Sequence, residues 1–237
     1  MGTILPLRLD AVTYRAAGKP LVDGISLTLD GGPRTVILGP NGAGKSLLLR
    51  LCHGLLAPTA GEIRWLGTDS ANRRRQAMVF QRPVMLRRSA AANIDYALRL
   101  QRIPADRRRA RTGEVLADTG LRAIAQRPAR RLSIGEQQRL ALARAWATAP
   151  EVLFLDEPTA NLDPAATRAV EDIISAIDLG GTKIIMTTHD LGQARRLADE
   201  IIFLHRGRLL EQRPAADFFS RPATPEAAAF IAGKLLW

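Results

Sequence analysis

The sequence predicts an α/β protein with a helical segment inserted into its core. Four apolar, β-branched runs each precede a turn and a helical pattern, and they lie at 34–38, 151–155, 183–188 and 200–204. Strands without polar alternation are typical of parallel sheets, which helices cover on both faces. Residues 84–145 differ, because they are rich in Arg and Ala, have helical periodicity and contain no convincing strand. Together the two patterns predict one α/β core and one helical part inserted into it.

The residues before the first apolar run predict a smaller sheet. Residues 7–15 and 25–30 are short extended stretches separated by Gly and Pro. Polar and apolar residues alternate in the second stretch, which predicts a strand with one face toward water. At the other end of the chain, residues 214–237 predict one or two short helices and are too few for a further domain.

Composition limits the class of protein. The 237 residues are 46% hydrophobic and 24% charged, which is typical of a globular protein with a substantial core. No run approaches the roughly 18 consecutive apolar residues of a membrane-spanning helix, and no secretory signal is expected. The single cysteine, Cys52, can form no internal disulfide, which fits a reducing cytoplasm, and we expect a buried structural thiol.

The net charge of +11 comes almost entirely from arginine. Such a charge is compatible with nucleic acid or with an anionic membrane face as partner. The arginine-rich stretches at 72–76, 106–114 and 127–132 are scattered, however, and no aromatic residues lie between the arginines to stack on bases. Solvated helix faces are therefore the favoured interpretation, and no nucleic acid is expected as a partner.

The stretch GPNGAGKS at 39–46 matches the phosphate-binding pattern G-x-x-x-x-G-K-[ST] between a predicted strand and a predicted helix. Its glycines allow backbone N–H groups to wrap a phosphate, and the helix points its positive end at the same anion. Lys45 can reach the β- and γ-phosphates, and the hydroxyl of Ser46 can bind Mg²⁺. The nucleotide-binding candidates here are Gly39, Pro40, Asn41, Gly42, Ala43, Gly44, Lys45 and Ser46.

Two further predicted strands end in residues suited to hydrolysis of a nucleoside triphosphate. Asp156 follows the run 151–155 and suits the Mg²⁺ shell, while the neighbouring Glu157 suits a general base or water-orienting role. Adjacent carboxylates at a strand end are costly to ionise together unless a cation lies there. His189, after the run 183–188, can contact the γ-phosphate. Because ligands bind beyond the carboxyl ends of strands in open α/β sheets, these strand ends predict a Mg-ATP site.

The stretch RLSIGEQQRLALARAW at 131–146 begins with a helix capping box. Ser133 can accept a hydrogen bond from the backbone N–H of Glu136, whose carboxylate can reach back to the N–H of Ser133. A well-capped helix explains this pattern by itself. A capped helix start is also an anion site, so the Ser133 hydroxyl and the Gly135 N–H can hold a phosphate as well.

These motifs occur in the order and spacing of ATP-binding cassette (ABC) ATPases, which the sequence resembles over nearly its whole length. LSIGEQQRLALARA resembles the family signature, FQRP its Q-loop, TANLD its D-loop and TTHD its switch histidine. The resemblance implies a single ABC ATPase domain with a P-loop NTPase (RecA-like) core, an N-terminal antiparallel β subdomain and an inserted helical subdomain. The core with the β subdomain is then expected at about 1–83 and 146–237, and the helical subdomain at about 84–145.

The resemblance also implies roles for residues outside the three strand ends. Gln81 of the Q-loop is expected on Mg²⁺ and on the coupling route to a membrane subunit. Tyr14 falls where the family stacks adenine on an aromatic ring, and a buried strand tyrosine is the alternative. Two copies are expected to close head to tail around two ATPs, with some residues completing the site of the other copy. Those residues are Ser133, Gly135 and Glu136 of the signature, and Asp163 of the D-loop is a further nucleotide-binding candidate.

Two positions depart from the family pattern. The signature normally has glycine after its serine, whereas this chain has Ile134. A β-branched residue resists positive φ, so the loop either adopts ordinary backbone geometry there or carries strain. Activity is expected to survive, because the flanking Ser133 and Gly135 are retained. Asn161 in the D-loop replaces the commoner small residue, with no predicted effect.

The resemblance implies a transport ATPase whose closing and reopening drive a separate membrane permease at the cytoplasmic face of the inner membrane, with a solute-binding protein as an indirect partner. The stretch 81–100 resembles short importer subunits for oxyanions, tungstate above all, while phosphate, molybdate and polar amino acids remain alternatives. A cassette ATPase acting on DNA or ribosomes is less favoured, because the 52 positions from Gln81 to Ser133 hold no sustained heptads and the chain has one P-loop. A P-loop kinase does not explain the signature stretch.

Overall fold

The computed structural model describes residues 3–68 and 75–234, so most of the arginine-rich stretch at 72–76 lies outside the described residues. The chain folds into two compact units, one made of residues 1–73 and 183–237 and the other of residues 74–182. The predicted helical segment 84–145 lies wholly within the second unit. The subdomain boundaries expected from the sequence stay a prediction.

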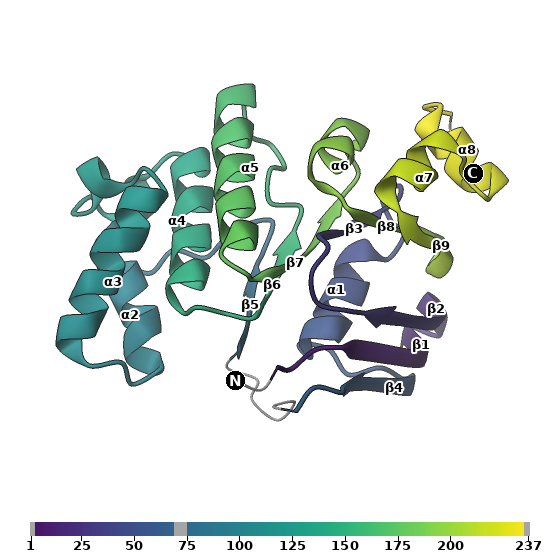
Figure 1. Cartoon of the computed structure of the whole chain (residues 1–237), viewed down its shortest axis with the longest axis horizontal. Coiled ribbons are helices and arrows are strands. Elements are labelled where there is room, and N and C mark those ends of the chain that lie inside the picture. Colours follow the sequence, from purple (N-terminus) through teal and green to yellow (C-terminus); the bar gives the residue numbers. More distant parts are fainter. Residues whose placement is uncertain (1–2, 69–74, 235–237) are drawn as a thin grey trace. The chain divides into compact units, whose positions relative to one another are not determined.

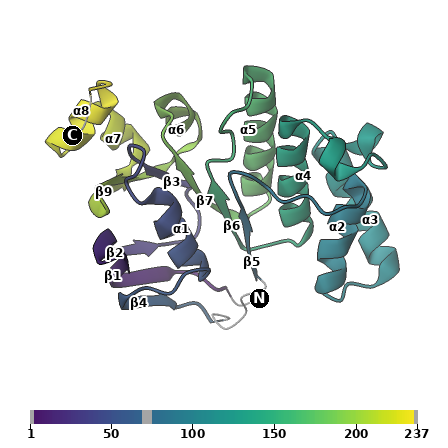
Figure 2. The same ribbon diagram turned by 180° about the vertical axis from the view of Figure 1, so that it is seen from behind.

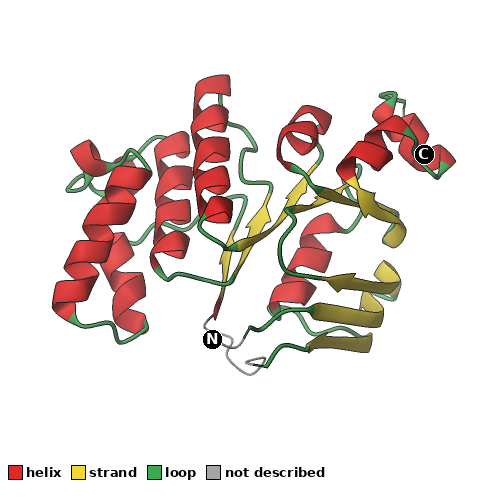
Figure 3. Cartoon of the chain, viewed as in Figure 1, coloured by secondary structure: helices red, strands yellow, loops and turns green. Residues whose placement is uncertain are grey.

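An antiparallel sheet with the strand order β2-β1-β4 belongs to the first unit (Figure 3). The strands are β1 (Leu7–Ala16), β2 (Lys19–Leu29) and β4 (Ala60–Trp65). Leu7 faces Leu29 on one side and Trp65 on the other, which fixes the register of the three strands. The N-terminal antiparallel sheet and its first two strands are confirmed. The sequence does not predict β4, because none of its residues is fully buried and its apolar pattern is weak.

The same unit contains four strands in the order β7-β3-β8-β9. They are β3 (Thr35–Leu38), β7 (Lys183–Thr188), β8 (Glu200–His205) and β9 (Arg208–Pro214). β3 runs parallel to β7 and β8, and all its residues are buried, as an apolar run without alternation predicts. β9 is an antiparallel edge strand that the sequence does not predict, because only one of its residues is buried.

Short helices complete the described part of the first unit. They are α1 (Lys45–His53), α6 (Leu191–Leu197), α7 (Ala215–Ser220) and α8 (Pro225–Ile231). α1 contacts β2 and β7 (Figure 2). α7 and α8 confirm the short helices predicted for the tail, and an aromatic cluster anchors them. Phe203 of β8 packs against two rings of the tail. Its ring centroid lies 5.6 Å from that of Phe218 and 5.4 Å from that of Phe230.

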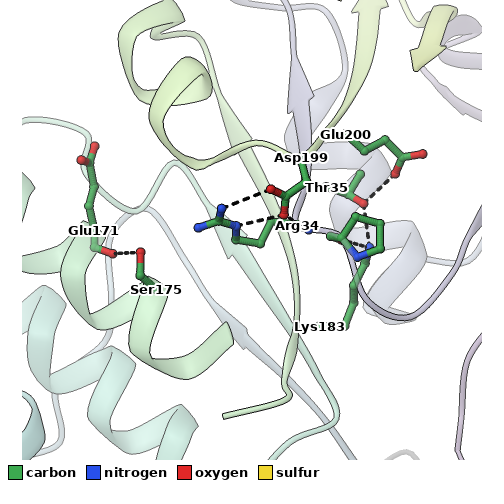
Figure 4. Close-up of polar contacts among 8 residues, drawn as sticks. Arg34, Thr35, Glu171, Ser175, Lys183, Asp199 and Glu200 are labelled. Atoms are coloured by element: carbon green, nitrogen blue, oxygen red, sulfur yellow. Dashed lines mark hydrogen bonds and ion pairs between the residues drawn. The ribbon is translucent and has the colours of Figure 1, made fainter. Parts of the chain in front are cut away.

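A polar network ties the amino-terminal ends of neighbouring strands in the first unit (Figure 4). Lys183, at the start of β7, is buried and donates to the carbonyl oxygen of Pro33 and, at 2.9 Å, to the hydroxyl of Thr35. Thr35 in turn donates to the carboxylate of Glu200 at 2.7 Å. Because these acceptors satisfy the Lys183 ammonium, its burial costs less than that of an isolated charge.

The second unit combines two parallel strands with four α-helices that lie side by side (Figure 1). The strands are β5 (Gln76–Val79) and β6 (Val152–Asp156), and the helices are α2 (Ala90–Leu100), α3 (Ala105–Asp118), α4 (Ile134–Ala147) and α5 (Pro164–Leu179), with 3-10 turns η2 (Arg122–Ile124) and η3 (Ala129–Arg131). β6 is fully buried, as predicted. The described residues from 84 to 145 form helices and no strand, also as predicted. Within residues 3–68 and 75–234, no helix has the length and apolar character needed to cross a membrane.

Cys52 is buried on α1, as the sequence predicts. Burial raises the pKa of its thiol to about 12. Because the thiolate is the nucleophile, a thiol with so high a pKa is inert near neutral pH. Cys52 is therefore a packing residue of the helix that begins at the phosphate-binding loop.

Candidate functional site

The phosphate-binding loop follows β3 and leads directly into α1, so the predicted strand–turn–helix pattern is confirmed. Gly42 and Gly44 have φ angles of 79° and 97°, in the left-handed region that favours glycine. A Cβ atom on Gly44 would also lie 2.7 Å from the carbonyl oxygen of Leu21 on β2. Position 44 therefore requires glycine for two separate reasons, its positive φ and the close approach of Leu21.

Lys45 is the first residue of α1, and only 5% of its surface is exposed. Its ammonium donates to the carbonyl oxygens of Gly39 and Pro40 at 2.9 and 3.1 Å. These bonds hold a positive charge inside the loop, where the positive end of α1 adds to it. Ser46 lies in the first turn of the same helix. A buried cation, a helix start and glycine turns form a cradle that fits the phosphates of a nucleotide.

His189 lies at the same sheet edge as this loop. Leu38, the last residue of β3, pairs with Thr188, the last residue of the parallel strand β7. The next residues along the two strands are Gly39 and the exposed His189. The structure therefore brings the predicted histidine to the start of the phosphate-binding loop.

Tyr14 is half-buried on β1 and pairs with Val22 of β2. β2 is the strand that approaches the loop, because a Cβ atom on Gly44 would lie 3.7 Å from a methyl group of Val22. Tyr14 thus lies one strand away from the loop. Its partial exposure suits both adenine stacking and strand packing, and both interpretations stay predictions.

In the second unit, Asp156 and Glu157 stand at the carboxyl end of β6 as predicted. Asp156 is 2% exposed, and Glu157 has a φ of 43°, which is uncommon for a residue with a side chain. Val79 of β5 pairs with Leu155 of β6, so Gln81 and Glu157 follow at equivalent positions. The Gln81 amide nitrogen donates to the Glu157 carboxylate at 3.5 Å. This bond uses the amide nitrogen of Gln81 and not its amide oxygen, which is the atom that would bind Mg²⁺.

The capping box at the start of α4 is present as predicted. The Ser133 hydroxyl accepts from the backbone N–H of Glu136 at 3.2 Å, and the Glu136 carboxylate accepts from the N–H of Ser133 at 2.7 Å. The bond from the Ser133 backbone is the main reason that the pKa of Glu136 lies below its usual value. The Ser133 hydroxyl still has its own proton to donate to an anion.

The predicted signature and D-loop residues line one hollow of about 780 Å³ in the second unit. Asp163 caps α5 and accepts from the N–H of Ala166 at 2.8 Å. A Cβ atom on Gly135 would lie 2.9 Å from the Cβ of Ala166, so the starts of α4 and α5 approach closely. Two helix amino-termini beside one hollow favour an anionic ligand there. The predicted site residues at this hollow are Ser133, Gly135, Glu136 and Asp163.

Comparison with known sequences decides the family. A family model described as ABC transporter matches residues 22–160, which is more than half of the chain. The chain belongs to the ABC transporter family. It is an ATP-binding, ATP-hydrolysing subunit of an ABC transporter, as its sequence motifs predict.

Relatives of this ABC subunit are named for several cargoes. It is 37% identical over 230 residues to the methionine import ATP-binding protein MetN of Caulobacter vibrioides, with 92% of this chain and 69% of the relative covered. It is 39% identical over 196 residues to the tungstate uptake system ATP-binding protein TupC of Peptoclostridium acidaminophilum, covering 82% of this chain and 92% of the relative. Other relatives are named for phosphate and nickel. The comparison therefore does not single out the tungstate type.

A solved structure supports the ABC ATPase fold. This ABC subunit superposes on cbiO1 from Clostridium perfringens with a TM-score of 0.80 at 29% identity, covering 91% of this chain and 90% of the other. That protein is described as part of the ABC transporter complex cbiONQ. The predicted P-loop NTPase core with its antiparallel β sheet and helical part is confirmed.

The two departures from the ABC family pattern fit their backbone positions. Ile134 is the first residue of α4, has no positive φ and is 65% exposed. Of the two outcomes expected from the sequence, the loop therefore adopts ordinary geometry. Asn161 has a φ of 63°, which asparagine tolerates better than most residues with a side chain.

The hollow that Ser133 and Asp163 line also contains one polar residue that the sequence does not predict as a site residue. Arg139 lines the hollow of this ABC subunit, and its guanidinium donates to the carbonyl oxygens of Thr119 and Gly120 at 3.1 and 3.3 Å. Its position one helical turn after Glu136 is the only sequence signal that places it on this face of α4. Arg139 adds a fixed positive charge beside the two helix starts.

A second hollow, also not predicted, lies between β5, α2 and α4. This groove has a volume of about 450 Å³ and a mainly apolar lining that includes Met78, Leu86 and Leu100. Leu100 is 63% exposed, an unusual position for a leucine at a helix end. Arg144 of α4 lines the groove as well and donates to the carbonyl oxygen of Val84 at 2.9 Å. Burial lowers the pKa of the Arg144 guanidinium, so the groove combines apolar surface with a poorly solvated cation.

Proposed function

We propose that this chain is the ATPase subunit of an importer and works as a pair of identical copies that close on ATP and reopen on hydrolysis. The proposal is carried by two separate phosphate-binding features on one chain, the loop 39–46 and the capped helix start at 133–136. A nucleotide on the loop already has its phosphates held. The second feature then serves the nucleotide of another copy, which gives a two-fold pair with two shared sites.

Within each shared site, Lys45 and the backbone N–H groups of the loop hold the β- and γ-phosphates. The side chains that would hold Mg²⁺ are those of Ser46, Gln81 and Asp156, because a hydroxyl, an amide oxygen and a carboxylate are the oxygen donors that Mg²⁺ prefers. When bound, Mg²⁺ neutralises charge on the phosphate oxygens. The position of Ser46 in the first turn of α1 and the buried position of Asp156 support these assignments.

Glu157 orients the attacking water and accepts its proton, and His189 contacts the γ-phosphate. The hydrogen bond from Gln81 to Glu157 gives this carboxylate a defined position. Gln81 follows β5, which also lines the apolar groove, and donates to Glu157 after the neighbouring strand β6, so β5 connects the groove to the residue that contacts the hydrolytic carboxylate. This connection supports Gln81 as the link between hydrolysis and the membrane subunit.

The permease docks in the groove between β5, α2 and α4. The groove exposes apolar side chains such as that of Leu100 to water, which is unfavourable. Covering them with another chain lowers the free energy and so favours binding of a partner. The description of the similar cbiO1 structure as part of a transporter complex supports a membrane partner for this chain too. The chain then acts at the cytoplasmic face of the inner membrane and meets a solute-binding protein only through the permease.

The cargo is a small oxyanion, with tungstate as the first candidate. The relative named for tungstate uptake is 39% identical over 82% of this chain, and another relative is named for phosphate. Phosphate, molybdate and polar amino acids are the alternatives. Uptake of tungstate into cells with and without this chain tests the cargo, with molybdate, phosphate and methionine as competitors. Uptake of methionine but not tungstate would contradict the oxyanion proposal and leave the importer proposal intact.

The decisive experiment on hydrolysis is Glu157→Gln. The variant should bind ATP, turn it over roughly 10²–10⁴ times more slowly, and accumulate as an ATP-bound dimer in size-exclusion chromatography. Glu62→Gln, which changes an exposed carboxylate on β4, is the control and should keep wild-type turnover. Wild-type turnover in Glu157→Gln would remove Glu157 from the mechanism. An ATP-loaded variant that stays monomeric would contradict the paired arrangement.

A further inference from the structure

The positive charge of this chain is concentrated in one segment. Residues 82–131 contain 13 arginines and only four acidic residues, a net charge of +9 out of +11 for the whole chain. The remaining residues are therefore close to neutral, with a net charge of +2. Coding bias toward arginine would enrich the whole chain and does not explain this separation.

Five of these arginines gather at the start of α2, on two segments that backbone hydrogen bonds hold together. The N–H of Ala90 donates to the carbonyl oxygen of Arg127 at 3.0 Å, and the N–H of Ala129 donates to that of Arg88 at 2.9 Å. All five side chains are exposed. This arginine cluster consists of Arg87, Arg88, Arg127, Arg130 and Arg131.

The arginine cluster has almost no acidic partner within residues 3–68 and 75–234. Arg127 lies 3.5 Å from Glu136, and this is its one ion pair in the described chain. Arg130 donates to the carbonyl oxygen of Met85 at 3.2 Å, while the guanidinium groups of Arg87 and Arg131 form no hydrogen bond or ion pair with the described residues. The positive end of α2 adds to the same field. Such a surface attracts a polyanion rather than a single carboxylate.

We propose that the arginine cluster binds the headgroups of anionic phospholipids. Guanidinium groups bind phosphate oxygens in a bidentate manner, which suits a phosphodiester headgroup. The cluster borders the groove, because Arg88 stacks over the ring of Tyr96 at 4.8 Å and Tyr96 lines the groove. Its nearness to the membrane rests on the proposed function, in which this groove receives the permease.

Nucleic acid fits the arginine cluster less well. Binding of single strands relies on aromatic rings whose faces are open to bases. Tyr96, the aromatic ring that an arginine of the cluster contacts in the described residues, has the guanidinium groups of Arg88 and Arg99 at 4.8 and 5.8 Å from its centre. Arginine side chains therefore already lie against this ring, and it does not offer a free face on which a base could stack.

The test is co-sedimentation of the purified full chain with vesicles of phosphatidylcholine, with and without about one third phosphatidylglycerol. We expect binding to the anionic vesicles that weakens with salt, and little binding to the neutral ones. The triple variant Arg87→Gln, Arg88→Gln, Arg131→Gln should bind at least about tenfold more weakly, because each arginine near an anionic surface contributes about fivefold. A matched control with the same charge change, Lys19→Gln, Arg221→Gln, Lys234→Gln, should lose less than about threefold.

Several outcomes would overturn the lipid proposal. These are equal binding to neutral and anionic vesicles, equal losses in the two triple variants, displacement of the chain from vesicles by millimolar inorganic phosphate, and tighter binding to a single-stranded oligonucleotide than to vesicles. ATP hydrolysis by both triple variants is measured in solution alongside and should stay at the wild-type rate. Loss of vesicle binding with intact hydrolysis supports the lipid surface and separates it from the proposed ATPase function. Loss of both activities in an arginine-cluster variant whose circular dichroism spectrum matches wild type would contradict a lipid surface separate from the ATPase site.

Discussion

Gly44 shows at the scale of one residue why the phosphate-binding loop requires glycine. Its φ of 97° is strained for any residue with a side chain, and a Cβ atom would lie 2.7 Å from the carbonyl oxygen of Leu21. Gly18, on the turn between β1 and β2, has a similar φ of 77° but open space where its Cβ would be. The two glycines therefore separate backbone strain from steric conflict.

Gly44→Ala should destabilise the chain more than Gly18→Ala does. Gly18→Ala brings only the left-handed strain of about 1–2 kcal/mol, whereas Gly44→Ala adds the conflict with β2 and displaces the loop. Urea unfolding measures the free energy of unfolding of both variants, and titration with ATP measures affinity. ATP affinity should fall in Gly44→Ala and stay unchanged in Gly18→Ala. Equal effects of the two substitutions on both quantities would contradict a special role for the contact with Leu21.

At the scale of elements, the capping box joins the stability of α4 to pH. Glu136 accepts from the N–H of Ser133 at 2.7 Å and lies 3.5 Å from Arg127, and the backbone bond chiefly lowers the pKa of its carboxyl. A carboxyl with a lowered folded-state pKa contributes stability above its unfolded pKa. That contribution disappears as the pH falls through the folded-state pKa.

Glu136→Gln should therefore reduce the free energy of unfolding at pH 7 by about 0.5–1 kcal/mol, since glutamine keeps the capping geometry but loses the charge. The difference from wild type should shrink toward zero as the pH falls below the ordinary value of 4.5. Glu114→Gln is the control, because the partner of Glu114 in the described residues is Arg111, in an exposed ion pair on α3. Urea unfolding at pH 7 and pH 3 checks both. A difference for Glu136→Gln that persists at pH 3 would show that the charge is not responsible.

Some strands and helices of this chain can be predicted from its sequence and others cannot. Runs such as 151–155, buried on both faces, predict strands correctly, and the capping box at Ser133 predicts the start of α4. β4 and β9 are not predictable in this way, because their strand character comes from pairing with β1 and β8 rather than from apolar periodicity. The position of Arg139 at the hollow and the groove between β5, α2 and α4 are not predictable from the sequence either. Each depends on which faces of different helices meet, and residue spacing within one helix does not determine that.

The groove allows a prediction that separates coupling from hydrolysis. Leu100→Asp places a charge in the apolar lining and should reduce solute uptake by the assembled transporter at least about tenfold, because burying an unpaired carboxylate against the permease is costly. ATP hydrolysis by the isolated chain should stay within about twofold of wild type, because Leu100 is 63% exposed and its change disturbs little packing. Leu179→Asp, on the 87% exposed end of α5, is the matched control and should leave uptake unchanged. Equal uptake by both variants would place the permease elsewhere.

At the scale of the whole molecule, we propose that each nucleotide site is built from two copies of the chain. One copy supplies the loop that contains Lys45, and the other supplies the helix start at Ser133. This division makes a strong prediction about mixtures, because defects in the two features lie in opposite halves of each shared site. A chain that completed its own site would behave differently, since each defect would then inactivate its own chain alone.

Lys45→Ala and Ser133→Ala should each be nearly inactive alone and recover activity when mixed. In a mixed pair, the loop of the Ser133→Ala copy meets the intact helix start of the Lys45→Ala copy, so one of the two sites is whole. With random pairing, half of the dimers are mixed, and turnover per chain should rise to about one quarter of wild type. Phosphate release measured at several mixing ratios checks this, with a mixture of Lys45→Ala and Lys45→Met as the control that cannot recover. Activity in the first mixture that never exceeds the sum of the separate variants would show that each chain works on its own nucleotide.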